Sequence, residues 1–426
     1  MFFRQYERTA HCASLRLVIY TVVAVLSLGS VSAPAALAAG ENQPERVDDG
    51  LPAYNFPYKN GLYATIAGYL GIKDIELKNF RTYTLRIDGF RDKVTARAIL
   101  QNKPAPLVVV LLGIDGKVEG KLGKLWPSWF ERAGYNVLTF DSTFLPSFIR
   151  VSGHGVTGNL VVEADRVSQI IGAFLKLGDV KGNVTSVGVA GMSYGGIEAL
   201  LLGEMQKEGK LPFKIDAIQA FSPPIKLQRT GMLIDKWYDE DRWNYTLADL
   251  SSDLSGHKPV SGSSVPFSDG LMRAGISALF RIGLADVIVR NDAEYKLKLL
   301  PEGENVFEEP YVKQEYAETW GYEKFMEEMC FPYWQKKQNM HELKDLTDRI
   351  ELCKLLAKQS ASSEVILAAD DPFNTSEDFE EFKECSAKSR VTILPNGGHL
   401  GFAADPWTKA KLLSMFKSAE KQANGN

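Results

Sequence analysis

Short apolar runs alternate with longer segments of helical periodicity through much of the chain. Most of the runs are continuous rather than alternating, which is typical of strands buried on both faces of a parallel sheet. The expected strands lie at 83–87, 94–99, 107–112, 135–140, 184–189 and 215–220, and at the starts of 364–372 and 390–401. The expected helices lie at 125–133, 160–177 and 196–206. This alternation predicts an α/β fold with a mostly parallel central sheet flanked by helices.

Two segments fall outside the alternation. Residues 226–360 are rich in charged and aromatic side chains and predict a largely helical insertion between strands 6 and 7. Its aromatics either cover a site, as in a lid, or form the small core of the insertion itself. Within it, 255–268 is rich in Gly, Ser and Pro and indicates a loop. Residues 39–80 are expected to form an N-terminal extension, which leaves 81–225 and 361–426 as the two parts of the core.

The first 38 residues have a pattern of their own. Three arginines precede the apolar run 17–28, and small residues then lead to Ala-Leu-Ala at 36–38. This order predicts a signal peptide over 1–38 and export to a bacterial periplasm or beyond. Because no charged residue lies between 17 and 40, an uncleaved N-terminal membrane anchor is the alternative.

The charge and the cysteine content of the chain bear on its binding partners and on its disulfide bonds. The formal net charge is −4 at pH 7, and removal of 1–38, with three Arg and one Glu, leaves −6. A mildly acidic chain argues against nucleic acid as a partner. Cys330, Cys353 and Cys385 would remain, and an oxidising compartment permits one disulfide, for which Cys330–Cys353 is the pair closer in sequence. The odd cysteine is expected to be a buried free thiol. No residue spacing predicts a metal site, and no cofactor is expected.

The candidate chemistry begins at residues 184–203, where a β-branched stretch passes through Gly-x-Ser-x-Gly into an apolar helix. In such a nucleophile elbow, Ser193 would lie at a strained turn with its hydroxyl exposed above the sheet. Gly191 and Gly195 lack the side chains that would collide across that turn. The five-residue pattern is weak alone, and its place between strand and helix makes it specific.

A serine hydroxyl is a poor nucleophile, so it needs a base that is oriented by an acid. His399 follows the last expected strand and is the expected base. Asp371, beside a proline, is the expected acid, and Asp370 is the less favoured choice. All three residue types follow strands, and the carboxyl ends of parallel strands meet at one edge of a sheet. Of the remaining histidines, His11 lies in the segment that is expected to be removed. The other three are expected to be solvated or structural, although the first of them could line the pocket: His154, His257 and His341.

The elbow, the aspartate loop and the Gly-Gly-His loop resemble the α/β-hydrolase superfamily over about 81–225 and 361–420. The resemblance implies a Ser–His–Asp triad, a cap domain at the insertion, and an oxyanion hole made by the backbone N–H groups of Ile114 and Tyr194. The family usually has His-Gly before the first of these donors, where this chain has Leu112 and Gly113. Backbone donors need no particular side chain, so the hole is still expected.

These features predict a secreted serine hydrolase that cleaves a small-molecule carboxylic ester through an acyl-enzyme intermediate. A peptidase or amidase would use the same residues and is the second interpretation. The third is a binding protein on a hydrolase scaffold with an idle triad, suggested by the missing His-Gly and by the large insertion. No nucleic acid partner, no stable membrane span after cleavage and no cofactor are expected.

Overall fold

The computed structural model describes residues 51–241, 267–303, 308–359, 363–387 and 389–416. The expected signal peptide and all but two residues of the expected loop 255–268 lie outside this part of the chain, as do His11 and His257.

Eight strands form one sheet in the order β1-β2-β4-β3-β5-β6-β7-β8. The pairings β1–β2 and β2–β4 are antiparallel, and all the others are parallel. The strands are β1 Arg81–Leu85, β2 Val94–Ile99, β3 Ala105–Leu111, β4 Asn136–Thr139, β5 Val184–Met192, β6 Ala217–Phe221, β7 Ser363–Ala368 and β8 Val391–Leu394. The expected mostly parallel sheet is therefore confirmed.

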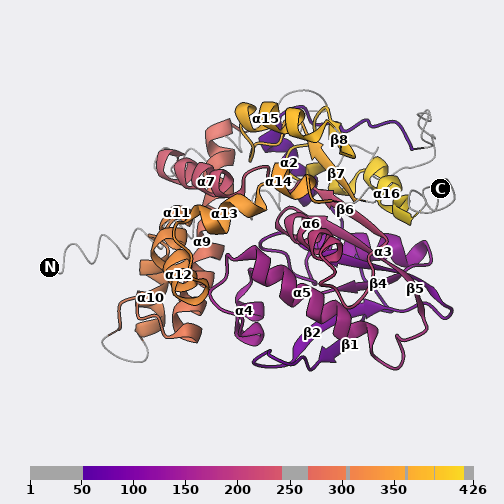
Figure 1. The fold of residues 1–426 in the computed structure, drawn as a ribbon. Helices are drawn as coiled ribbons and strands as arrows, with labels where there is room; N and C mark the ends of the chain where they lie inside the picture. Colours follow the sequence, from indigo (N-terminus) through magenta and orange to yellow (C-terminus); the bar gives the residue numbers. More distant parts are fainter. Residues whose placement is uncertain (1–50, 242–266, 304–307, 360–362, 388, 417–426) are drawn as a thin grey trace.

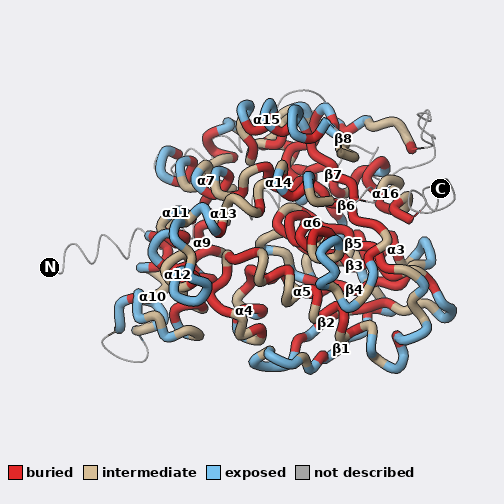
Figure 2. Tube along the Cα trace, viewed as in Figure 1, coloured by how far each residue is buried: buried red, intermediate tan, exposed pale blue. Residues whose placement is uncertain are grey.

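Both faces of the sheet are buried, which explains the continuous apolar runs. In β3, Leu107 and Val109 contact one core cluster, while Val108 and Val110 contact a second cluster on the opposite face. Helices α5 (Leu160–Leu175) and α6 (Tyr194–Lys207) pack in the first cluster, and α3 (Lys121–Arg132) and α16 (Pro406–Leu413) in the second. Figure 2 shows that the central strands and α6, which covers one face of the sheet, are largely buried.

The chain between β6 and β7 folds largely into helices, which gather on the left of the sheet in Figure 1. The longest, α9, contacts α7, α10, α4 and α2. The α-helices of this segment are α7 Leu227–Asp241, α9 Asp269–Tyr295, α10 Glu309–Ala317, α11 Tyr322–Phe325, α12 Phe331–Gln338, α13 Lys344–Thr347 and α14 Leu352–Leu356. The others are α2 Gly61–Leu70, α4 Pro146–Ser152 and α15 Ser376–Ser386.

Helix α2 packs closely on the turn Gly401–Ala404 that follows β8. A Cβ on Gly68 would lie 2.0 Å from the carbonyl oxygen of Gly401, so the two backbones nearly touch. A Cβ on Gly61 would lie 1.8 Å from the carbonyl oxygen of Asp370. Glycine is required at both positions, and the N-terminal segment is thereby held against the loops after β7 and β8.

The disulfide joins Cys353 to Cys385, so the pairing of Cys330 with Cys353 is wrong. Cys330 is the free, buried thiol, and it lies in a π-helical turn where a Cβ on Gly158 would meet its sulfur at 2.9 Å. The prediction failed because it used separation along the chain. Helices α14 and α15 lie side by side in space, which places the two more distant cysteines within bonding reach.

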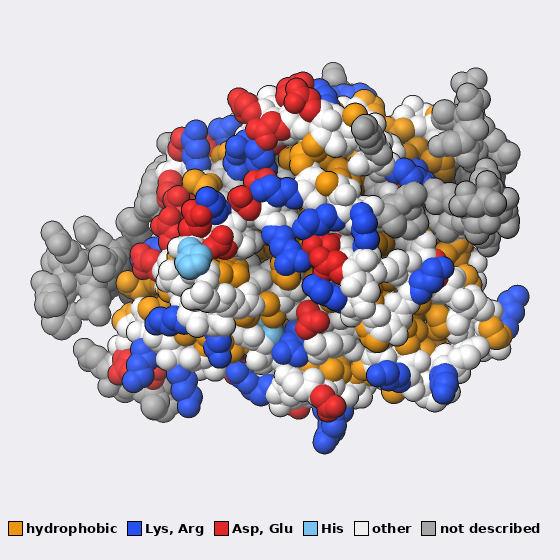
Figure 3. All heavy atoms as spheres, in the orientation of Figure 1, with side chains coloured by type: hydrophobic (Ala, Val, Ile, Leu, Met, Phe, Trp, Pro, Cys, Tyr) orange, Lys and Arg blue, Asp and Glu red, His pale blue; other side chains and the backbone are white. Residues whose placement is uncertain are grey.

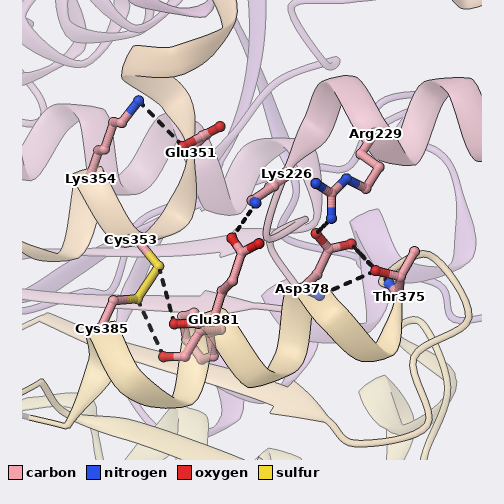
Figure 4. Close-up of polar contacts among 10 residues, drawn as sticks. Lys226, Arg229, Glu351, Cys353, Lys354, Thr375, Asp378, Glu381 and Cys385 are labelled. Carbon is pink, nitrogen blue, oxygen red and sulfur yellow. Dashed lines mark hydrogen bonds and ion pairs between the residues drawn. A yellow bond between two sulfur atoms is a disulfide. The ribbon is translucent and has the colours of Figure 1, made fainter.

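Ion pairs accompany this disulfide. Figure 4 shows Lys226 beside Glu381 and Arg229 beside Asp378, so that the start of α7 is joined to α15 next to the sulfur bridge. The segment between β6 and β7 is therefore fastened to the core near both of its ends.

The surface carries both signs of charge. On the face drawn in Figure 3, Lys and Arg side chains are interspersed with Asp and Glu. No helix within the part of the chain that the structure describes is long and apolar enough to cross a bilayer.

Candidate active site

Ser193 stands at the turn between β5 and α6. Its φ is 51° and its ψ −116°, a conformation that is uncommon for a residue with a side chain. Its N–H donates to the carbonyl oxygen of Phe221 at 2.8 Å, which holds the turn against β6. A Cβ on Gly191 would lie 2.2 Å from the oxygen of Gly195, and a Cβ on Gly195 would lie 2.5 Å from the oxygen of Leu112. The turn therefore admits only glycine at these two positions.

The structure brings Ser193, His399 and Asp371 together in one hydrogen-bonded chain. Nε2 of His399 lies 2.8 Å from Oγ of Ser193, and Nδ1 lies 2.8 Å from Oδ2 of Asp371. The Asp371 side chain is fully buried and that of His399 is 9% exposed. The other oxygen of Asp371 accepts from the N–H of Phe373 at 3.0 Å. The geometry therefore allows Asp371 to fix the imidazole with Nε2 facing the serine.

Asp370 has a different position. Its Oδ1 accepts from the N–H of Gly398 at 2.8 Å, so it holds the loop that carries His399 instead of contacting the imidazole. Burial raises the pKa of Asp370 above its ordinary value. The two neighbouring aspartates thus hold the same histidine loop, one through the side chain and one through the backbone.

Thr65 of α2 is a site residue that sequence reasoning missed. Its hydroxyl donates to the carbonyl oxygen of Gly61 at 2.7 Å and accepts from the backbone N–H of His399 at 2.8 Å. On the other side, the ring of Phe373 packs against the imidazole with centroids 4.4 Å apart. A single threonine more than three hundred residues from the histidine carries no sequence signal, so only the fold reveals it.

Of the two expected oxyanion donors, Tyr194 directly follows the serine in the chain, and Ile114 lies in the loop after β3. A Cβ on Gly113 would lie 3.5 Å from Cβ of Ser193, so the loop after β3 runs beside Ser193. Among the described residues, neither the N–H of Ile114 nor that of Tyr194 donates to another group. Leu112, which replaces the family's usual histidine, is buried in the core. Both amides are therefore free to bind an anionic oxygen of a substrate.

Helices α7 and α9 reach the loops around the site. Trp237 of α7 packs against Phe373 with ring centroids 5.9 Å apart. A Cβ on Gly283 of α9 would lie 2.8 Å from a carboxylate oxygen of Asp115, in the loop after β3. The segment between β6 and β7 therefore contacts both the loop that carries Phe373 and the loop after β3.

Two other histidines lie in the described chain. Nδ1 of His154 lies 2.6 Å from Oγ of Ser152, and burial lowers the pKa of His154 to about 4, so its imidazole is neutral at pH 7. The backbone N–H of His341 donates to Asp345 on the surface. Neither contacts Ser193 within the ranges that the structure covers. No cluster of three or more His, Cys, Asp or Glu side chains there could hold a metal ion.

No protein-family model matches the chain, and no curated protein matches it significantly. Solved structures do resemble it. An esterase of Pyrococcus furiosus is 14% identical, with 90% of this chain and 99% of that chain covered and a TM-score of 0.45. An esterase of Rhizomucor miehei is 12% identical, with 85% and 89% covered and a TM-score of 0.44. A bacterial membrane phospholipase A is 14% identical, with 80% and 87% covered and a TM-score of 0.42.

The class of fold follows from this chain's own topology. The turn at Ser193 lies between β5 and α6, and Ser193, Asp371 and His399 follow one another along the chain, each after a parallel strand. The protein has an α/β-hydrolase fold.

Proposed function

We propose that the protein is a serine hydrolase that cleaves carboxylic esters. The observation that carries this proposal is the hydrogen-bonded chain from Ser193 through His399 to the buried Asp371, with both 2.8 Å contacts to the imidazole already formed. A catalytic base must lie within hydrogen-bonding reach of the proton that it takes, and Nε2 meets that requirement.

In the first half of the proposed reaction, Oγ of Ser193 attacks the carbonyl carbon of the ester while Nε2 of His399 takes the hydroxyl proton. The electron pair of the carbonyl bond moves to the oxygen, which accepts hydrogen bonds from the N–H groups of Ile114 and Tyr194. When the intermediate collapses, the alcohol leaves with the proton from His399. Removing one oxyanion donor typically lowers kcat by about a hundredfold to a thousandfold.

In the second half, water replaces the alcohol. His399 takes a proton from this water, and the hydroxide attacks the acyl carbonyl. When this second intermediate collapses, His399 returns the proton to Oγ of Ser193 and the carboxylic acid leaves, losing its own proton to solvent. Asp371 accepts from the Nδ1–H throughout and stabilises the imidazolium that forms twice in the cycle. No further group is needed for the atoms and charges to balance.

An apolar surface beside the imidazole of His399 supports the proposal that the substrate is an ester with an apolar acyl or alcohol group. Phe373 packs on His399, and it belongs to a cluster with Trp237 of α7, Leu62 of α2 and Met272 of α9. Side chains of this kind bind hydrocarbon and exclude water from an ester carbonyl. We propose that this cluster contacts the acyl or alcohol group of the substrate.

We also propose that the protein acts outside the cytoplasm, after export. The Cys353–Cys385 disulfide supports this location because such bonds persist in oxidising compartments. The mass of the protein purified from the exported fraction, together with its N-terminal peptide, tests the proposal. An intact N-terminus in a cytoplasmic fraction contradicts it.

Labelling with a fluorophosphonate probe tests the function. The parent protein should label and hydrolyse short nitrophenyl esters, and Ser193→Ala should lose both properties. Ser414→Ala, whose hydroxyl bonds only within the last turn of α16, is the matched control and should keep both. A folded parent protein that resists the probe would instead favour a binding role. A higher kcat/KM on an amide than on the matched ester would favour an amidase.

A further inference from the structure

A buried polar network lies directly beneath the nucleophile turn. It joins four side chains: Thr143 after β4, Glu163 in the first turn of α5, and Tyr194 and Glu198 on α6. None of them is more than 2% exposed. Burying two carboxyl groups is costly unless hydrogen bonds compensate, so the arrangement calls for an explanation.

Glu163 is an acceptor at both of its oxygens. Oε2 accepts from the hydroxyls of Tyr194 and Thr143, each at 2.7 Å. Oε1 accepts from the N–H of Gly158 at 2.7 Å and from the hydroxyl of Thr157 at 3.0 Å. Since every partner is a donor, this site fits a carboxylate and does not fit an amide, whose NH₂ group would face a donor.

The proton of the pair lies on Glu198. Its Oε1 is 2.6 Å from Oγ1 of Thr143. The Thr143 hydroxyl has one proton but lies within hydrogen-bonding distance of both carboxyl groups, so one of the two must supply the proton of its own contact. Burial, and next the charge of Glu163, raise the pKa of Glu198 to about 8, which agrees with a protonated acid at pH 7.

Tyr194 connects this network to the site, because its backbone N–H lies at the start of α6 directly after Ser193. We propose that Glu163 is a positioning residue: by holding the Tyr194 hydroxyl, it fixes the Tyr194 amide where it stabilises the oxyanion. The inference rests on the proposed function, since it assigns a role in that same reaction.

The physical need arises from the turn itself. Ser193 has a positive φ that its surroundings must enforce, and Tyr194 is the next residue along the chain. Rotation about the bonds between them would swing the amide away from the carbonyl oxygen. The ring of Tyr194 is packed against Phe144 with centroids 5.5 Å apart, and the bond to Glu163 fixes its far end. Fixed donors stabilise a transition state better than donors that must reorganise.

Tyr194→Phe is the main test because it keeps the ring and removes one hydroxyl. We expect kcat to fall about tenfold with KM within about twofold of the parent, because the weakened contact is made mainly in the transition state. Affinity for a trifluoromethyl ketone, which forms a charged hemiketal with the serine, should fall by the same factor as kcat/KM. A role limited to stability would leave both quantities unchanged in the folded variant.

The matched control is Tyr83→Phe, on the edge strand β1. Tyr83 also donates its hydroxyl to a carboxylate, Asp179, at 2.8 Å, but it lies away from the turn. It should keep the parent kcat and the parent affinity for the ketone.

Glu163→Gln is the second variant, and it should lower kcat more strongly, about a hundredfold, because an amide cannot accept at both positions. If either folded variant retains the parent kcat and ketone affinity while Ser193 still reacts with the fluorophosphonate, the positioning role is wrong and the proposed function stands. If the parent protein itself does not label, the proposed function fails instead.

Discussion

At the residue scale, the two neighbouring aspartates show how far sequence reasoning reaches. The strand ending at Ala368 and the proline at 372 made both Asp370 and Asp371 candidates for the acid. The choice between them depends on which side chain points toward His399. The backbone of the loop and its contact with Gly398 decide this, and no local sequence pattern encodes either. Ser193 and His399 are easier to predict from the sequence, because each motif contains only one serine or one histidine.

Substitution of each aspartate separates their roles. Asp371→Asn should lower kcat by about a thousandfold to ten-thousandfold, because an amide favours the wrong imidazole tautomer. Asp370→Asn should cost less than about tenfold, because its amide oxygen can still accept from Gly398. Steady-state kinetics on a nitrophenyl ester measure both effects, and equal losses would contradict the assignment.

Glu198 gives a pH dependence of stability. The pKa of Glu198 is about 8 in the folded protein against an ordinary 4.5. Between pH 4.5 and pH 8, therefore, Glu198 is protonated in the folded state and ionised in the unfolded state. Stability from this group is therefore complete below pH 4.5, declines as the pH rises and levels off above 8. Glu198→Gln removes the decline.

Urea unfolding at pH 5 and pH 8 checks this expectation. The parent protein should lose on the order of a few kcal/mol more than Glu198→Gln between the two pH values. All other titratable groups are common to both proteins, so the difference between the two losses reports on position 198. An equal loss in the two proteins would mean that Glu198 is not the proton carrier.

At the element scale, the hydrophobic pattern predicts β2 at its observed bounds, Val94–Ile99, and places the fully buried β3 within two residues of its observed ends. Helix α3 was predicted to start at 125 but starts at Lys121. Its first residues include Gly123, where a Cβ would lie 2.4 Å from the carbonyl oxygen of Lys117, so a close backbone contact and not an apolar pattern sets the start of the helix. Helix α2 was placed only within an extension. Its role depends on packing against the turn after β8, and no local pattern encodes that contact.

Thr65 tests the role of α2. Thr65→Val keeps the shape and removes the acceptor for the His399 N–H, so kcat should fall and the unfolding free energy should drop by about 1–3 kcal/mol. Thr82→Val is the control, because the Thr82 hydroxyl accepts from Arg97 on the exposed edge of the sheet. The two variants are compared by ester hydrolysis and urea unfolding. Unchanged hydrolysis by Thr65→Val would show that the loop keeps its position without the hydrogen bond from the His399 N–H to Thr65.

At the scale of the whole molecule, the disulfide fastens the segment between β6 and β7 to α15. The bridge closes a loop with a sequence separation of 32, for which chain entropy gives a stabilisation of about 3–4 kcal/mol. The double variant Cys353→Ser, Cys385→Ser should lose about that much in urea unfolding. Cys330→Ser should keep the bridge, and peptide mapping of the unreduced protein should find Cys353 joined to Cys385. A peptide joining Cys330 to either partner would contradict the fold.

The near contact of Gly68 with Gly401 has a consequence for proteolytic processing. Serine, aspartate and histidine all lie downstream of 190, so a chain trimmed after Leu70 would still contain every reacting group. It would lack the threonine and the close-fitting helix that seat the histidine loop, and we expect it to be inert toward esters. We therefore expect that proteolysis beyond α2 would abolish the proposed ester hydrolysis while leaving Ser193, Asp371 and His399 in the chain.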